Sequence, residues 1–286
     1  MSDAVVIWGE LLWDRFPDGD RLGGAPANVA WHLGQAGGWP QLVTRVGDDD
    51  DGRRAVETIS QLVDTELVQI DPERATGEVT VHLDNGEPRY TLHPGRAWER
   101  IECTPQVRSA LATAGVFVYG TLAQRTAEGL AGWREASAAT RATHVCDLNL
   151  RPTDHGNAVV EALAAAHVVK VNDRELAFLR DRLGWSDPLA KLRDTARIVA
   201  VTHGADGATL YGDSVVEVAG MAAKPGGDNV GCGDAFLAIL IHGLTSGWEL
   251  AASGAAASRY AAAVAGETGA TPLFDPELIS SWLEPG

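Results

Sequence analysis

The sequence predicts an α/β protein whose mostly parallel central sheet is covered by helices on both faces. Short β-branched segments alternate with longer segments of helical periodicity along most of the chain. Near-continuous apolar strands separated by helices indicate a parallel sheet that is buried on both sides. Because the crossovers in such a sheet are right-handed, we expect a three-layer α/β/α sandwich. The composition, 45% apolar and 22% charged, is that of a globular protein.

The individual elements follow from these patterns in chain order. Segments with the composition of buried strands are 4–8, 41–46, 115–120, 143–148, 167–171 and 197–202. Segments with helical patterns lie between them, near 25–36, 51–63, 124–139, 156–166 and 173–182. Beyond about residue 220 the chain is rich in alanine, and its apolar residues keep helical spacing, which predicts further helices.

Two segments interrupt this alternation, 11–22 and 77–92. The second has alternating runs around Asn85-Gly86, and Asn-Gly is a strong signal for a two-residue hairpin turn. Hairpins that protrude from a parallel sheet could form a small β lid over an active site, or they could be surface hairpins without a role. Without repeats or linkers, we expect residues 1–286 to form a single domain with lid segments at about 11–22 and 77–98.

Composition also excludes several classes of partner. The net charge of −16 argues against nucleic acid, which requires a basic face. No stretch approaches the ~20 apolar residues of a membrane span, and the beginning of the chain lacks the pattern of a signal peptide. Cys103, Cys146 and Cys232 have no metal-ligand spacing and are expected to be reduced thiols. We therefore expect a cytoplasmic protein that binds neither nucleic acid nor membrane.

The segment "GGDNVGCGD" (226–234) has the composition of an anion-binding site. If a helix begins near Gly233, the amides of Gly231, Cys232 and Gly233 have no helical acceptor and can bind an anion. Asp234 would then be placed to accept a proton from a hydroxyl that attacks a bound phosphoryl group. Asp234 could equally be an acidic residue that only favours the helix dipole. The motif alone leaves both interpretations open.

A second polar group lies near the beginning of the chain. Gly23-Gly24 precede a predicted helix with Asn28 on its first turn, where an amide can donate to and accept from sugar hydroxyls. Asp14 in the proposed lid would add a carboxylate acceptor. The alternative is that Asn28 caps the helix. The chain has neither a P-loop nor a Rossmann glycine fingerprint.

Two further motifs follow predicted strands, at the edge where open α/β sheets bind ligands. Asn172 is followed three residues later by Glu175, a pattern that an ordinary helix cap explains equally well. Thr202, Gly204 and Gly207 lie between two strands, where a plain β-turn is the alternative.

The order of these motifs resembles that of the ribokinase/PfkB family of carbohydrate kinases over essentially the whole chain. The matching motifs are Gly-Gly-x-x-x-Asn at 23–28, "GDDDDG" at 47–52, Asn-x-x-Glu at 172–175 and Asp-x-x-Gly-x-Gly-Asp at 228–234. The segments "GELLWD", "GGAPANVA" and "DLNLRP" (147–152) are most similar to fructokinase-type members.

The resemblance implies a ribokinase-like fold and an ATP-dependent sugar kinase with D-fructose as the first candidate acceptor. The alternatives are a 2-keto-3-deoxygluconate, ribose or nucleoside kinase, and a catalytically silent sugar-binding homologue. A homodimer formed through the lid is a further expectation. The implied site comprises Asp234 as base; the amides of Gly231, Cys232, Gly233 and Asp234 as anion hole; Asp14, Gly23, Gly24 and Asn28 for the sugar; Asn172, Thr202, Gly204 and Gly207 for the nucleotide; Glu175 for Mg²⁺ through water; and Asp228 with carbonyls near Gly269 for K⁺.

The chain departs from the family pattern at three places. Asn229 and Cys232 stand where the family usually has Thr and Ala, but both changes keep the main-chain donors of the anion hole. Cys232 is expected to be inert as a small buried side chain. The segment "YTLHPGRAW" (90–98) replaces the usual arginine-containing strand on the sugar side, so it bears on which sugar is bound.

Overall fold

The computed structural model describes residues 4–84, 87–150 and 156–284, and its largest element is an eight-stranded sheet. Its strand order is β14-β13-β12-β11-β10-β9-β1-β4. The strands are β1 (Val5–Trp8), β4 (Gln41–Val43), β9 (Val116–Tyr119), β10 (Thr143–Asp147), β11 (Val168–Asn172), β12 (Ile198–Thr202), β13 (Gly207–Tyr211) and β14 (Val215–Ala219). Pairing is parallel from β4 to β12 and antiparallel for β13 and β14. The predicted α/β fold with a mostly parallel sheet is confirmed.

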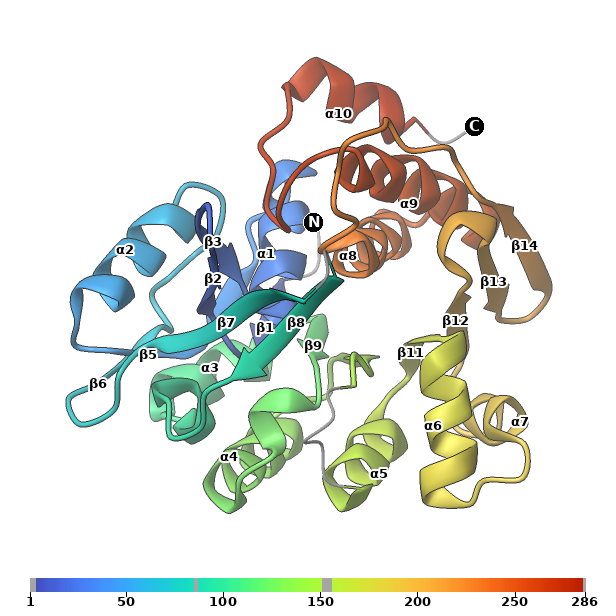
Figure 1. Ribbon diagram of the computed structural model, residues 1–286. Coiled ribbons are helices and arrows are strands. Elements are labelled where there is room, and N and C mark those ends of the chain that lie inside the picture. The colour runs from blue at the N-terminus through green and yellow to red at the C-terminus, as the bar shows by residue number, and fades with distance from the viewer. Residues whose placement is uncertain (1–3, 85–86, 151–155, 285–286) are drawn as a thin grey trace.

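Helices cover both faces of this sheet (Figure 1). On one side lie α1 (Ala25–Gln35), α8 (Cys232–Thr245), α9 (Leu250–Ala265) and α10 (Pro276–Trp282). On the other lie α3 (Pro105–Thr113), α4 (Ala127–Ala138), α5 (Gly156–Ala165), α6 (Asp173–Leu183) and α7 (Pro188–Arg193). Strand alternation divides the core accordingly, because Val6 and Trp8 pack with the second group while Ile7 packs with α1 and α8. No helix in residues 4–84, 87–150 and 156–284 is long and apolar enough to cross a membrane.

The segment predicted as one strand over 41–46 is divided, which corrects that prediction. β4 ends at Val43, and the carbonyl of buried Thr44 accepts a hydrogen bond from the amide of Gln69 (2.9 Å). The chain then continues as β5 (Arg45–Gly47), which pairs with β6 (Gln69–Asp71) in a separate two-stranded sheet. Both short strands are largely buried and only Thr44 separates them, so composition alone does not reveal the change of partner.

The two interrupting segments form one lid sheet, with strand order β3-β2-β7-β8. Its strands are β2 (Leu12–Phe16), β3 (Gly19–Gly23), β7 (Gly77–Asp84) and β8 (Glu87–Leu92). β2 pairs in parallel with β7, and the predicted hairpin between β7 and β8 closes with Asp84 opposite Glu87. The turn residues Asn85 and Gly86 lie outside the described residues.

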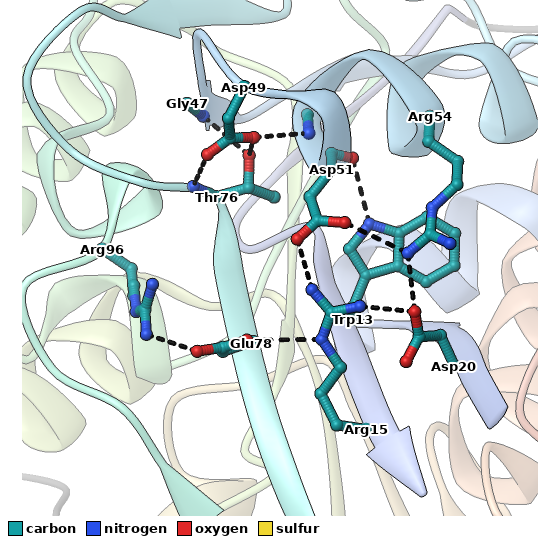
Figure 2. A network of polar contacts seen from close by, with 11 residues as sticks. Trp13, Arg15, Asp20, Gly47, Asp49, Asp51, Arg54, Thr76, Glu78 and Arg96 are labelled. Carbon is teal, nitrogen blue, oxygen red and sulfur yellow. Dashed lines mark hydrogen bonds and ion pairs between the residues drawn. The ribbon is translucent and has the colours of Figure 1, made fainter. Parts of the chain in front are cut away.

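Polar contacts attach the base of the lid sheet to helix α2 (Asp50–Ile59), as Figure 2 shows. The carboxylate of Asp49 caps α2 and also accepts from the amide and hydroxyl of Thr76, at 2.8 and 2.6 Å. Arg15 of β2 pairs with the Asp51 carboxylate, and the Trp13 indole donates to the Asp51 carbonyl (3.0 Å). The lid is therefore held at its base by helix α2, which contains the second half of the "GDDDDG" motif.

Candidate active site

Helix α8 begins directly after the glycine-rich loop, as the anion-hole interpretation requires. Its N-cap is Gly231, whose φ of 77° is left-handed, and a Cβ there would lie 2.7 Å from the Cβ of Ala270. Only glycine fits this combination of backbone angle and close approach. The first helical hydrogen bond runs from the Ala235 amide to the Gly231 carbonyl (2.8 Å). The amides of Cys232, Gly233 and Asp234 precede it, so they have no acceptor within the helix.

Asp234 and Asn28 meet at the beginning of this helix. Both are buried, with 7% and 5% of their surface exposed, and Asn28 Nδ2 donates to Asp234 Oδ2 over 2.8 Å. Helix α1 is capped by Gly24 without any side-chain hydrogen bond, so the alternative that Asn28 caps the helix is wrong. The Asn28 side chain is directed towards the predicted base instead.

The other predicted sugar-binding residues continue this cluster towards the lid. Asp14, half-buried on β2, lies against the bare face of Gly23, where a Cβ would come within 2.3 Å of Asp14 Oδ2. Gly24 has a φ of 105°, and a Cβ there would lie 2.3 Å from the Glu10 carbonyl oxygen. The two glycines thus allow the lid carboxylate to approach the beginning of α1.

Asn149 is a member of the cluster that the sequence motifs did not single out. Its Nδ2 donates to Asp234 Oδ1 over 3.3 Å, so each carboxylate oxygen of Asp234 accepts from an amide. Asn149 has a φ of 35°, an angle that is uncommon outside glycine and often marks a functional position. Asn149 lies in "DLNLRP", a segment that resembles fructokinase-type members; Arg151 and Pro152 of that motif lie outside the described residues.

Lys170 was also missed, although the sequence places it two residues before Asn172. Its buried ammonium forms a salt bridge with Asp147 on the neighbouring strand (3.0 Å). The available signal was a lysine within an otherwise apolar strand, "HVVKV", because such a side chain is rarely buried without a partner.

Asn172 and Glu175 form a complete capping box at the beginning of α6. The Asn172 side chain accepts from the Glu175 amide (3.0 Å), and Glu175 Oε2 accepts from the Asn172 amide (2.8 Å). Glu175 Oε1 accepts from the Leu150 amide (2.9 Å), so both oxygens have backbone donors. Burial raises the pKa of Glu175, and the neighbouring Asp147 adds to this effect while Lys170 opposes it. The helix-cap alternative is confirmed, and it places Glu175 next to the segment that contains Asn149.

The remaining nucleotide-side residues lie further along the same edge of the sheet. Thr202 is paired with Asn172 in the register of β12 and β11. Gly204 begins a single 3₁₀ turn that joins β12 to β13, and Gly207 begins β13. The connection is therefore a short turn between two strands, as the alternative interpretation of these residues predicted. The structure therefore brings these residues to the edge of the sheet where Asn172 lies.

Asp228 and Gly269 are brought together by direct contact. Asp228 Oδ2 accepts from the Gly269 amide (2.8 Å), and Oδ1 accepts from the Val230 amide (3.0 Å). The next residue, Ala270, packs against Gly231. The loop predicted to hold a monovalent cation therefore contacts the loop that begins α8.

Cys232 has the environment expected of an inert thiol. Burial, with the nearby carboxylates of Asp234 and Asp228, raises the pKa of the Cys232 thiol to about 12. The thiol therefore stays protonated and weakly nucleophilic at neutral pH. Cys103, Cys146 and Cys232 are all free.

Comparisons with known proteins agree with this geometry. Residues 19–277 match the model of the pfkB family carbohydrate kinases. The chain is 31% identical to a fructokinase of Klebsiella pneumoniae over 268 residues, which cover 86% of each protein. The crystal structure of fructokinase from Vibrio cholerae O395 with fructose, ADP and calcium bound is 26% identical, with a TM-score of 0.85 over 99% of each chain. A double mutant of that fructokinase, with fructose, ADP and potassium bound, is 25% identical with the same TM-score.

The family match spans most of the chain, and the fold and the glycine-rich helix start agree with it. The chain therefore belongs to the pfkB family of carbohydrate kinases and is a sugar kinase.

Proposed function

We propose that this kinase phosphorylates D-fructose with ATP. The observation that carries the proposal is the contact between Asn28 and Asp234 at the beginning of α8, with Asp14 of the lid continuing the same cluster. Carboxylate and amide groups at adjacent positions suit a polyhydroxylated sugar, because they can both accept from and donate to its hydroxyls. The sequence identity of 31% to the fructokinase of Klebsiella pneumoniae makes fructose the first candidate acceptor.

In this proposal Asp234 is the general base of the reaction. The sugar hydroxyl attacks the γ-phosphorus while its proton passes to the Asp234 carboxylate, and the bond to the leaving ADP oxygen breaks. Asn28 and Asn149 hold the two carboxylate oxygens at 2.8 and 3.3 Å, which fixes the orientation of the base. The amides of Gly231, Cys232, Gly233 and Asp234 stabilise the negative charge on the transferred group, since they point out of the positive end of α8.

The nucleotide would bind along the carboxyl edge of the sheet, bordered by Asn172, Thr202, Gly204 and Gly207. Mg²⁺ prefers a few carboxylates, several waters and the substrate phosphates as ligands. The described residues contain no cluster of three or more acidic, histidine or cysteine side chains that could hold a metal. Glu175 already accepts two backbone hydrogen bonds. These residues fit a Mg²⁺ that is bound mainly by the nucleotide, with Glu175 acting through water, and the ion would neutralise phosphate charge.

A K⁺ site is proposed beside the anion hole, at Asp228 and the loop that contains Gly269. The residues fit such a site because Asp228 supplies an acidic side chain and is hydrogen-bonded to the loop that packs on Gly231. A cation there would hold the two loops together and would not touch the sugar. Assembly into a homodimer through the lid stays a prediction.

The test is a ranking of kcat/KM for D-fructose, 2-keto-3-deoxygluconate, D-ribose and adenosine with ATP as donor. We expect fructose first and adenosine last, because a site built to bind hydroxyls rejects acceptors that leave its polar groups unpaired. Asp14→Ala should raise the fructose KM, and Asp18→Ala, at an exposed acidic position between the lid strands β2 and β3, serves as the matched control. Adenosine at the top of the ranking would overturn the sugar assignment.

A further inference from the structure

Lys170 extends from the central sheet to the first turn of helix α8. Only 5% of its side chain is exposed. A Cβ added to Gly233 would lie 2.7 Å from Lys170 Nζ and 3.4 Å from Cε, so the ammonium lies directly against the backbone of the anion hole. A side chain at position 233 would occupy the space that Lys170 fills, which explains a glycine at this helical position.

This is an unfavourable place for a cation unless an anion accompanies it. Burial costs an ammonium several kcal/mol, and the positive end of a helix dipole repels it. Asp147 offsets part of this cost, with Oδ1 at 3.0 Å and Oδ2 at 3.3 Å from Nζ. Burial alone would lower the pKa of Lys170, but the carboxylates of Asp147, Glu175 and Asp234 outweigh it and raise the pKa above its ordinary value. The ammonium is therefore charged at every pH at which the enzyme would work.

The Lys170 ammonium has hydrogen-bond donors that Asp147 does not use. Within the described part of the chain, Asp147 is the only residue that accepts a hydrogen bond from Nζ. An ammonium has three donors, and both contacts to Asp147 are made on one side. Because Nζ lies against Gly233, its remaining donors are available next to the turn whose amides have no helical acceptor. An arginine would need more space beneath Gly233, whereas a lysine ends in a compact point charge.

We propose that Lys170 is a catalytic residue that donates a hydrogen bond from Nζ to a non-bridging oxygen of the transferred phosphoryl group, and that Asp147 positions it. This inference rests on the proposed anion hole at α8. In the reaction the sugar oxygen forms a bond to the γ-phosphorus, the bond between that phosphorus and the ADP oxygen breaks, and its electron pair stays on ADP. The hydroxyl proton goes to Asp234. Lys170 keeps its proton throughout and stabilises negative charge on the phosphoryl oxygens.

The alternative is a purely structural ion pair, and a double variant separates the two. Lys170→Met leaves the Asp147 charge buried without its partner, which destabilises a fold strongly. Lys170→Met combined with Asp147→Asn removes both charges and keeps similar shapes, so it tests the chemistry in a folded protein. Lys191→Met, at an exposed lysine of α7, is the control for loss of a lysine charge. Thermal unfolding of each variant reports on the fold.

The experiment measures kcat and the acceptor KM for whichever sugar the wild-type enzyme phosphorylates fastest, together with the affinities for ADP and for ADP–aluminium fluoride in the presence of that sugar. We expect the folded double variant to lose about 10²- to 10³-fold in kcat, the usual effect of removing one donor to transition-state charge. Its acceptor KM and ADP affinity should change by less than about threefold, while the affinity for ADP–aluminium fluoride falls with kcat.

The inference is overturned if the double variant keeps more than a tenth of the wild-type kcat, if ADP affinity falls as much as ADP–aluminium fluoride affinity, or if both Lys170 variants fail to fold. A failure of the fructose assignment is distinguishable, because it appears in the acceptor ranking of the wild-type enzyme and not in the ratio between variants.

Discussion

Asn28 Nδ2 and Asp234 Oδ2 lie 2.8 Å apart, although 206 residues separate them in the chain. The contact joins the first turn of α1 to the first turn of α8, so the proposed sugar residue and the proposed base are placed by two packed helices. Sites held by rigid elements keep their geometry more closely than sites on loops.

Replacement of Asp234 by Asn should remove the base while preserving the shape of the cluster. We expect kcat to fall by about 10²- to 10⁴-fold, the range for loss of a general base. The sugar KM should change far less, because the Asn side chain can still bond to neighbouring groups. Steady-state kinetics with saturating ATP measure both quantities. A variant that retains most of its turnover would exclude Asp234 as the base.

Asn149→Ala should lower kcat with little effect on the sugar KM, because Asn149 Nδ2 donates a hydrogen bond to Oδ1 of the proposed base Asp234. Loss of one hydrogen bond to a charged group corresponds to about 1.5–3 kcal/mol, or about 10- to 150-fold. Asn28→Ala should raise the sugar KM as well, since Asn28 is proposed to touch both sugar and base. The check is a double-mutant cycle, in which Asn149→Ala has no further effect in the Asp234→Asn background. Additive losses would show that Asn149 acts elsewhere.

Monovalent cations should alter the rate through the loop that joins Asp228 to Gly269. We expect higher activity in KCl than in LiCl at equal ionic strength and saturating Mg²⁺, because the smaller ion fits the site poorly. Asp228→Asn should reduce the difference between the two salts. Equal rates of the wild-type enzyme in both salts would contradict a K⁺ site.

His32 should make the fold less stable in acid. Its Nε2 contacts the Ala270 carbonyl (2.9 Å) and its Nδ1 the Tyr260 hydroxyl (3.1 Å), an arrangement that suits the neutral ring. Burial lowers the pKa of His32 from 6.5 to about 4, against the weaker effect of the Ala270 hydrogen bond. Because the folded pKa is depressed, this stabilisation is complete above pH 6.5 and is lost as the pH falls towards 4.

The loss attributable to His32 between pH 7 and 5 is about 2 kcal/mol in the free energy of unfolding. Urea unfolding at the two pH values measures it, and His32→Gln should show a correspondingly smaller decrease. If wild type and variant have the same pH dependence, then His32 is not the group that titrates.

The lid sheet should become more protected when sugar binds. Its base is attached to α2 through Asp49 and Arg15, whereas a sheet of this size has little core of its own. We expect slower amide hydrogen exchange in β2 and β7 at saturating sugar, with exchange in α9 unchanged. Unchanged exchange in the lid strands would identify the sheet as a static extension of the fold.

The sequence alone predicted much of the fold, because its signals are local. The strand segments at 4–8, 115–120 and 143–148 lie within one residue of β1, β9 and β10, since apolar β-branched runs between helical patterns have few other structures. The glycine-rich loop before α8 and the hairpin of β7 and β8 were predictable for the same reason, because glycine and Asn-Gly act through their own backbone angles.

Only the tertiary structure decided which of these local features meet. In the folded chain the strand predicted over 41–46 is divided after Val43, and β2 pairs with β7 in one lid sheet. The Asn28 side chain does not cap helix α1 but donates a hydrogen bond to Asp234. The tertiary structure also brought Asn149 and Lys170 to the site, two residues that the sequence motifs did not single out. The physical reason is range: periodicity and turn signals depend on neighbours in the chain, whereas a catalytic cluster depends on how packed helices and strands place side chains that are far apart in sequence.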